Sequence, residues 1–258
     1  MKKLVYWLFL IPLMVIAQNS EQSSQPYAVF ENAILTPQPD KVQQFEQGLA
    51  AHNKNFHASE PYGARVYHIS NGPNVGKYMW TMGPLPWGAM DERPDDKAHD
   101  DDWINNVVKY MTADSDQSYW KFNNQLSNFP KDFKVNKLLV DMYDVKRFKD
   151  EGVMTAVEKV AKVMKEKFPD MTYGIYTNEM PSTKDGRDLS MVFFFDDMAW
   201  LGEDPKFVQA YEEMYGQDSW KDFMKEWGET TDGKQSELWI FDPELSGLGA
   251  DVKAMERQ

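Results

Sequence analysis

The residues best suited to acid–base chemistry are four histidines, and all of them lie in the first half of the chain: His52, His57, His68 and His99. His68 falls in a predicted strand, 64–69, and the next predicted strand, 77–82, carries Tyr78 and Trp80 on one face. If these strands pair, His68 faces an aromatic-lined hollow, where an imidazole can accept a proton from a phenolic or enolic substrate. We therefore predict His68 as a candidate general base, with Tyr78 and Trp80 as ligand-binding residues. A histidine that is only hydrogen-bonded to a neighbouring strand is the simpler interpretation and stays open.

Two other histidines lie on a predicted helix, 41–57, whose apolar face carries Phe45 and Leu49. His52 lies at the edge of that face, so the pattern predicts a residue at the boundary of the core and not a catalyst. His57 lies further round the helix and is predicted to be exposed to solvent.

The densest charge feature is the acidic run 91–102, which contains His99. Its carboxylates suit a hard cation such as Ca²⁺, but their spacing is not that of an EF-hand loop and the central glycine is missing. Negative charge is also favoured at a helix N-terminus, and helical periodicity resumes at Trp103. We predict a solvated loop that leads into a helix, with no metal ion and no cofactor. His99 and Trp87 are retained as candidate ligand-binding residues.

Several reaction classes have no motif in this chain. There is no cysteine, which excludes disulfides, thiol catalysis and thiolate metal sites. The sequence also contains no Gly-rich phosphate loop, no nucleophile elbow around a serine and no HExxH motif. Hydrolase, kinase and nicotinamide-dependent chemistry are therefore not indicated.

The composition is that of a folded, acidic protein. Hydrophobic residues make up 42% of the 258 residues, enough for a sizeable core, and the net charge is −13. Such a charge repels nucleic acid phosphates and anionic lipid surfaces, so neither is expected as a partner. A small-molecule ligand stays compatible with the composition, and the oligomeric state is left open.

The N-terminus is typical of a signal peptide. A basic start precedes an apolar run, Leu4 to Ile16, and Ala17 is a small residue where a signal peptidase cleaves. The run is short for a transmembrane span, so we predict cleavage and no stable membrane insertion, with a retained anchor helix as the alternative. The protein is thus expected to be exported, either periplasmic or secreted.

The remainder of the chain reads as a duplication. Residues 27–144 and 138–242 each follow the order strand, helix, two strands, helix, strand, and an aromatic third strand runs into a turn and a tryptophan in both. The predicted elements are strands 27–35, 64–69, 77–82 and 135–144 in the first copy. The second copy has strands 172–178, 189–198 and 238–241, a helix 152–167 and a helical stretch 205–230 that is interrupted near Gly216. We expect a signal peptide (1–17), a flexible leader (18–26), a first module (27–137), a second module (138–243) and a polar tail (244–258).

The fold class follows from burial. Residues 189–195 are apolar on both alternating faces, so this strand needs a cover on each side. Helices supply one cover, and the sheet of the other module is the simplest second one. We predict an α+β protein in which two tandem ferredoxin-like βαββαβ modules pack their antiparallel sheets face to face as an intramolecular α/β barrel.

This organisation resembles the dimeric α/β-barrel superfamily, with modules of the antibiotic-biosynthesis-monooxygenase type. Haem-degrading members use a Trp near the third strand, a His on the following helix and an Asn on the first strand. The nearest counterparts here are Trp80 or Trp87, His99 and Asn32, but His99 is predicted to precede the helix. Haem-binding relatives with two fused modules place their proximal His in the second module, where this chain has none. The resemblance therefore implies the fold and not haem chemistry.

Three functions are compatible with these observations. The first is an exported protein that binds a small apolar or aromatic molecule in a barrel pocket. The second is a cofactor-independent monooxygenase-like enzyme with His68 as its base, which the resemblance implies. The third is a structural or interaction module without a pocket. Fold alone does not decide between them.

Overall fold

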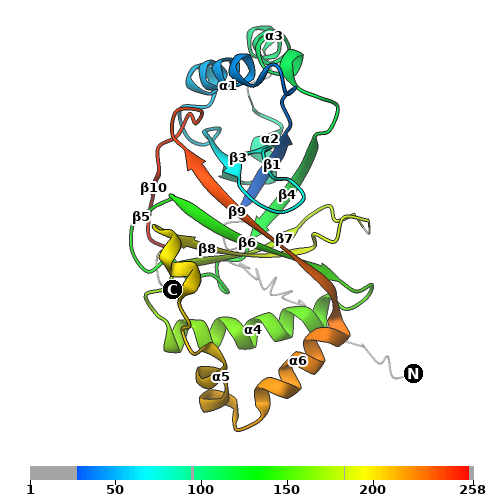
Figure 1. Cartoon of the computed structure of the whole chain (residues 1–258), viewed down its shortest axis with the longest axis vertical. Helices are drawn as coiled ribbons and strands as arrows, with labels where there is room; N and C mark the ends of the chain where they lie inside the picture. The colour runs from blue at the N-terminus through cyan, green and yellow to red at the C-terminus, as the bar shows by residue number, and fades with distance from the viewer. Residues whose placement is uncertain (1–27, 94–95, 183, 256–258) are drawn as a thin grey trace, which may run out of the picture.

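Eight strands close into a barrel in the computed structural model, which describes residues 28–93, 96–182 and 184–255 (Figure 1). The predicted signal peptide, 1–17, and leader, 18–26, lie outside the described residues. Around the barrel the strand order is β1-β3-β2-β9-β6-β8-β7-β4. This closed sheet consists of two four-stranded ferredoxin-like sheets that are joined to each other at both edges.

The first module supplies half of the barrel and one helical layer. Its elements are β1 (Val29–Leu35), α1 (Val42–Phe56), β2 (Ala64–Ile69), β3 (Tyr78–Leu85), α2 (Trp87–Met90), α3 (Lys97–Asn106), the 3₁₀ helix η1 (Val108–Tyr110) and β4 (Asp116–Phe122).

The second module repeats this plan. Its elements are β6 (Lys137–Val145), α4 (Asp150–Lys167), β7 (Tyr173–Asn178), β8 (Leu189–Phe195), the 3₁₀ helix η2 (Met198–Gly202), α5 (Phe207–Tyr215), α6 (Ser219–Thr230) and the long strand β9 (Thr231–Asp242). A small sheet of β5 (Phe133–Lys134) and β10 (Asp251–Val252) lies outside the barrel order.

Antiparallel pairing at two seams closes the barrel. At one seam β2 pairs with β9, with His68 opposite Ile240, and at the other β4 pairs with β7, with Trp120 opposite Asn178. Because every barrel strand then has two neighbours, neither sheet keeps a free edge. The predicted α+β class and the intramolecular barrel are confirmed.

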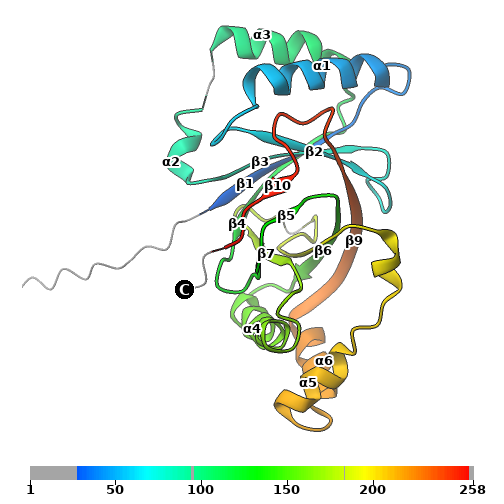
Figure 2. The same cartoon turned by 90° about the vertical axis from the view of Figure 1, so that its left-hand side faces the viewer.

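Strand alternation sorts the side chains between two layers. On β3, Met79 points into the barrel core, whereas its neighbours Tyr78 and Trp80 pack beneath the helices. Helices α1 and α3 cover the first sheet, and α4, α5 and α6 cover the second, at the opposite end of the molecule (Figure 2). Each module therefore has a space under its helices, and the two modules share the barrel interior.

One predicted strand was assigned to the wrong module, and one strand was missed. The strand predicted at 135–144 as the fourth of the first module is β6, the first strand of the second module, and it pairs with β8 and β9. The true fourth strand is β4, which pairs with β1 and contains Trp120 as its fully buried position. Since the other β4 positions are partly exposed, the strand lacks the alternation that would have revealed it.

The acidic run was also misassigned. The helix begins at Lys97 and not at Trp103, because the Asp96 side chain accepts a hydrogen bond from the His99 backbone N–H at 2.8 Å and caps the helix. Asp100 then lies in the first turn, where the helix dipole favours negative charge. His99 consequently lies on α3.

The predicted polar tail packs against the barrel. Leu245 and Ser246 are buried, and the Asn53 side-chain amide donates to the Leu245 carbonyl at 2.6 Å. Strand β10 then pairs with β5, and the Ala254 backbone N–H donates to Asp132 at 2.8 Å. The segment as far as residue 255 is thus part of the folded unit.

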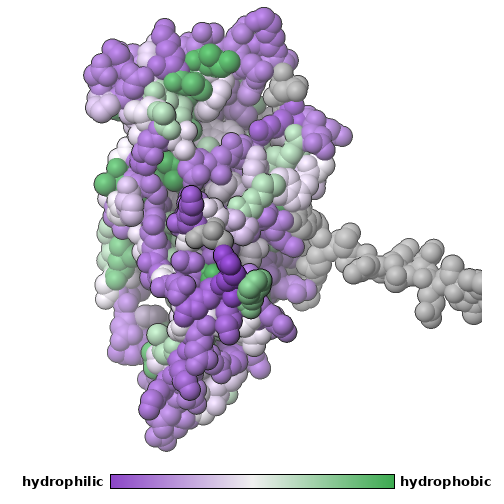
Figure 3. Space-filling model, turned by 90° about the vertical axis from the view of Figure 1, so that its right-hand side faces the viewer, coloured by the Kyte–Doolittle hydropathy of each residue, from purple (hydrophilic) through white to green (hydrophobic). Residues whose placement is uncertain are grey.

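The surface agrees with the acidic composition. The face drawn in Figure 3 is mostly hydrophilic, with hydrophobic side chains in separate small patches. Among the described residues, no helix combines the length and the apolar character that crossing a membrane requires.

Candidate functional site

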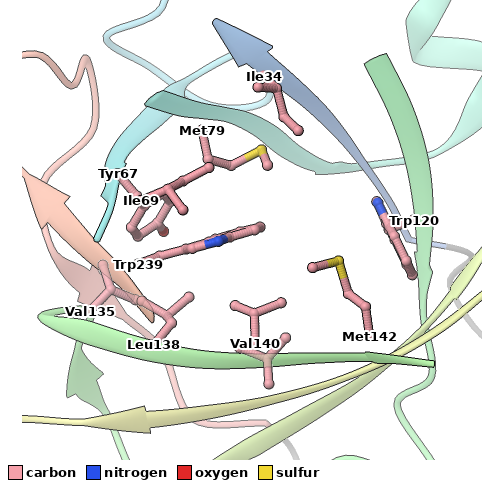
Figure 4. Close-up of a cluster of buried hydrophobic side chains, with 11 residues drawn as sticks. Ile34, Tyr67, Ile69, Met79, Trp120, Val135, Leu138, Val140, Met142 and Trp239 are labelled. Atoms are coloured by element: carbon pink, nitrogen blue, oxygen red, sulfur yellow. The ribbon is translucent and has the colours of Figure 1, made fainter. Parts of the chain in front are cut away.

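The barrel interior encloses a cavity of about 450 Å³. Its walls are mainly aromatic and aliphatic, and they include Tyr67, Met79, Trp120, Val140, Met142 and Trp239. Figure 4 shows Trp120 and Trp239 extending into the interior from different sides, with Met142 lying between them. This volume lies within the range of about 300–1,000 Å³ that is typical of small-molecule pockets.

A polar band crosses this apolar wall. In the ladders of β1, Asn32 lies opposite Thr81 of β3 on one side and opposite Ser118 of β4 on the other, and all three residues line the cavity. Ser118 accepts a hydrogen bond from the Trp120 indole at 2.9 Å. The buried Asn32 Oδ1 and Thr81 Oγ1 atoms have no hydrogen-bond partner.

A third unpartnered oxygen, Ser190 Oγ, faces the cavity from the second sheet. Two arginines also line the cavity: Arg65 donates to the carbonyls of Gly249 and Asp251, and Arg187 pairs with Asp116. A buried polar atom without a partner costs roughly 1–3 kcal/mol. The barrel therefore presents an apolar chamber with a few polar atoms that are free to bind.

A second cavity, of about 290 Å³, lies beneath α1 and α3. It brings together two of the predicted site residues, Trp80 from β3 and His99 from α3. The Trp80 indole donates to Asn53 Oδ1 at 3.0 Å, which fixes the ring against α1. Tyr78 lies on the same face of the sheet, where its hydroxyl donates to Glu46 at 2.6 Å, and burial raises its pKa.

Asn32 does not line the same cavity as Trp80 and His99. Although His99 lies on the helix after the third strand, as in the haem-degrading pattern, Asn32 lines the barrel cavity on the other face of the sheet. The polar residue of β1 that lines the His99 cavity is its neighbour Glu31, which is 5% exposed. Burial raises the pKa of Glu31, while the Arg93 guanidinium 2.5 Å away opposes that shift.

His68 and Trp87 lie apart from the described cavities. The His68 imidazole lies 2.7 Å from Asp242 and packs on the Tyr78 ring, but its side chain is 41% exposed and lines none of the three cavities described. Trp87 begins α2 and packs on Tyr119, with ring centroids 5.1 Å apart. The geometry gives no support for His68 as a base.

Two histidines that the sequence analysis set aside line the cavity beneath α1. His52 is 1% exposed, and His57, which was predicted to be solvated, is 7% exposed. Burial lowers the pKa of His52, and it lowers the pKa of His57 to about 4 even though a hydrogen bond to the Tyr62 carbonyl opposes the shift. Both rings are therefore neutral near pH 7. The only sequence signal for His52 and His57 as a pair was their separation of five residues near the end of the predicted helix.

The second module has a corresponding cavity of about 380 Å³ beneath α4, α5 and α6. Its lining is mainly aromatic and aliphatic, with Phe193, Phe207, Trp220, Phe223 and Trp227 among its residues. These rings pack on one another, as where Trp220 stacks on Phe223 with centroids 4.8 Å apart.

Comparison with known proteins supports the architecture. The structure is similar to proposed monooxygenases from Fusobacterium nucleatum (TM-score 0.57, 9% identity, 89% of this chain and 99% of the other) and from Lactobacillus acidophilus (TM-score 0.54, 13% identity, 89% and 100%). It is also similar to a mutant chlorite dismutase from Candidatus Nitrospira defluvii (TM-score 0.51, 8% identity, 84% and 92%).

The chain has the fold of the dimeric α/β-barrel superfamily. No protein-family model matches it, and no curated protein matches it in sequence. At these identities the similarity to other α/β-barrel proteins shows the fold alone, so function has to be argued from the cavities.

Proposed function

We propose that this α/β-barrel protein is an exported protein that binds a small, largely apolar or aromatic molecule inside its barrel. The observation that carries the proposal is a chamber of about 450 Å³ whose apolar wall contains unpartnered oxygens of Asn32, Thr81 and Ser190. The basic start and apolar run of residues 1–17 support export.

The chamber walls supply affinity, and the polar band supplies orientation. Apolar surface removed from water stabilises a complex by about 25 cal/mol per Å² before the costs of association. A ligand group that donates to Asn32 Oδ1 and bonds the Thr81 hydroxyl would relieve two unpartnered buried atoms at once. We expect an aromatic or acyl body that carries one small polar group.

The two alternative functions have weaker support. A monooxygenase-like enzyme with His68 as its base requires that residue to reach a substrate, and His68 lines none of the described cavities. A purely structural module would be expected to fill its barrel with side chains, whereas this barrel keeps a chamber.

The test is a binding measurement with a variant that fills the chamber. Native mass spectrometry and thermal shift with a panel of aromatic and acyl compounds should identify ligands that raise the Tm of the wild-type chain. Val140 is 2% exposed and lines the chamber, so Val140→Phe should abolish that stabilisation. Val75→Phe makes the same change at a position that is 60% exposed, and it should leave binding intact.

A second variant tests the polar band. Thr81→Val keeps the side-chain shape and removes an unpartnered hydroxyl, so the free protein should gain roughly 1 kcal/mol while affinity for a ligand that bonds the hydroxyl falls about tenfold. The proposal is wrong if no panel compound stabilises the wild-type chain, or if Val140→Phe binds as the wild type does.

A further inference from the structure

Three imidazoles converge beneath α1 and α3. His52 comes from the body of α1, His57 follows its last turn and His99 lies in the first turn of α3. One ring nitrogen from each lies within 4.8 Å of the others, and the Nε2 atoms of His57 and His99 are 3.4 Å apart. In a tetrahedral zinc site with Zn–N bonds of about 2.0–2.1 Å, two ligand nitrogens lie about 3.3 Å apart. The spacing of this pair is thus already that of a metal site.

The outer contacts of the rings fix their tautomers. His57 Nδ1 lies 2.7 Å from the Tyr62 carbonyl oxygen, which can only accept, so Nδ1 carries the hydrogen. His52 Nδ1 lies 2.8 Å from an Asp102 carboxylate oxygen, with the same consequence. In each neutral ring the lone pair therefore lies on Nε2, the nitrogen on the opposite side.

The lone pair on His52 Nε2 is the unsatisfied group of the cluster. It is buried and has no hydrogen-bond partner, although a backbone or side-chain donor normally satisfies such an atom. A proton on His99 Nε2 could bridge to His57, but it would leave His52 Nε2 unpartnered. A cation placed among the three rings would bind all three lone pairs at once.

The surroundings of the cluster are those of a metal centre with outer-shell support. A carboxylate and a backbone carbonyl hold the Nδ1 atoms of His52 and His57, and Asp100 Oδ1 lies 3.3 Å from His99 Nδ1. Partners of this kind orient ligand imidazoles and increase their basicity. The backbone also anchors the His57 position, since the His57 N–H donates to Asn53 O and its carbonyl accepts from Ala64 N–H.

The cluster is open on one side. All three histidines line the 290 Å³ cavity together with Trp80, Glu31 and Arg93. Three protein ligands with a fourth position facing a cavity is the arrangement of reactive metal sites, whereas structural zinc sites are closed by four protein ligands. The cavity could accommodate water or a small ligand at that fourth position.

We propose that His52, His57 and His99 bind a divalent first-row transition metal ion, with a fourth coordination position open to the cavity beneath α1 and α3. Three imidazoles favour zinc, copper, nickel or iron over the hard cations Ca²⁺ and Mg²⁺. The site differs from the cation site considered for the acidic run, because the ligands are imidazoles and the neighbouring Asp100 and Asp102 act only from the outer shell. It is also independent of the barrel chamber, which lies on the other face of the first sheet.

Cobalt is the probe that tests the proposal, because Co²⁺ in a tetrahedral nitrogen site absorbs strongly in the visible range. The full-length protein, freed of metal with a chelator, should bind one equivalent of Co²⁺ with that spectrum, and Zn²⁺ should displace it and raise the Tm. Ca²⁺ should do neither.

Two glutamine variants locate the site. His99 has the most exposed side chain of the three ligands, at 19%, so His99→Gln should fold, as near-ultraviolet circular dichroism can verify. Its affinity for Co²⁺ should fall by at least about 100-fold, beyond the effect typical of losing an outer-shell partner. His68→Gln alters the fourth histidine of the chain, outside the cluster, and should bind Co²⁺ as the wild type does.

Two results would overturn the assignment. One is a wild-type protein that binds Co²⁺ only weakly, without a tetrahedral spectrum. The other is a folded His99→Gln variant that retains the wild-type spectrum and affinity.

Discussion

Three histidines line the space beneath α1 and α3, whereas the corresponding space beneath α4, α5 and α6 has no histidine among its lining residues and is mainly aromatic and aliphatic, with one ion pair, Asp141 and Lys234. The strand order of the two modules is the same, so the fold places a cavity at the same point in each. What differs is the residue types that the covering helices present to that point.

This difference indicates that the two helical layers have different roles. In the second module, aromatic rings pack the helices on one another, and Phe207 and Trp227 also pack against the sheet. In the first module, α1 and α3 bury imidazoles beside an ion pair between Glu31 of β1 and Arg93, which weakens the apolar core but creates reactive groups. The shared barrel interior stays apolar and is available to a ligand. We expect stability to depend on the second helical layer and chemistry to depend on the first.

The largest effect should come from breaking the aromatic layer. Phe223 is 5% exposed and lies between Trp220 and Trp227, with ring centroids 4.8 and 5.8 Å away. Phe223→Ala should lower the free energy of unfolding by about 3–5 kcal/mol, measured by urea denaturation. Val208→Ala, on the exposed side of α5, should change it by less than about 0.5 kcal/mol. If the two variants unfold alike, the second layer does not have the stabilising role inferred here.

A smaller loss of stability should distinguish a substitution in α1 from a matched one in α4, the first helices of the two modules. In α1, a Cβ added at Gly48 would lie 1.7 Å from the Asn106 carbonyl oxygen, so Gly48→Ala must push α3 away from α1. We expect a loss of about 1–3 kcal/mol in stability. Co²⁺ binding should weaken as well, because α3 carries His99.

The matched control for that change lies in α4. At Gly152 the nearest atom to an added Cβ is the Thr230 methyl, 3.1 Å away, which can shift by the few tenths of an ångström required. Gly152→Ala should therefore be within about 1 kcal/mol of the wild type, helped by the higher helix propensity of alanine. If urea denaturation shows that Gly48→Ala and Gly152→Ala lose equal amounts of stability, the tight contact between α1 and α3 is contradicted.

The contact between α1 and α3 also illustrates which features could be predicted from the sequence and which could not. Alternation and the repeated element order were sufficient for the barrel, because they depend on local patterns. The polar band of the chamber was not predictable, since it needs the register that sets Asn32 opposite Thr81 and Ser118, and β4 itself was missed. The histidine cluster was missed because His99 reaches His52 only through the approach of α3 to Gly48, which involves residues far apart in sequence.

The smallest effects should come from the acidic run, where adjacent carboxylates have different surroundings. Asp102 is 23% exposed and holds His52, whereas Asp101 is 56% exposed and pairs with Lys97 one helical turn away. Asp102→Asn keeps an acceptor for the imidazole but removes its charge, so stability should fall by about 1 kcal/mol, the difference between a charge-assisted and a neutral hydrogen bond. Asp101→Asn should change stability by no more than about 0.5 kcal/mol, as exposed ion pairs do.

Co²⁺ titration of these two variants sharpens the comparison between the modules. Loss of an outer-shell carboxylate typically weakens metal binding by about 10–100-fold, so Asp102→Asn should move the titration midpoint by that factor while Asp101→Asn leaves it unchanged. Both substitutions remove one negative charge from the same helix, so a general electrostatic effect on a cation would weaken binding equally in both. Only a specific hydrogen bond from the His52 ring to Asp102 makes them differ. Equal shifts would mean that the run attracts cations as a diffuse acidic surface, and the chemical distinction between the two helical layers would then rest on the histidines alone.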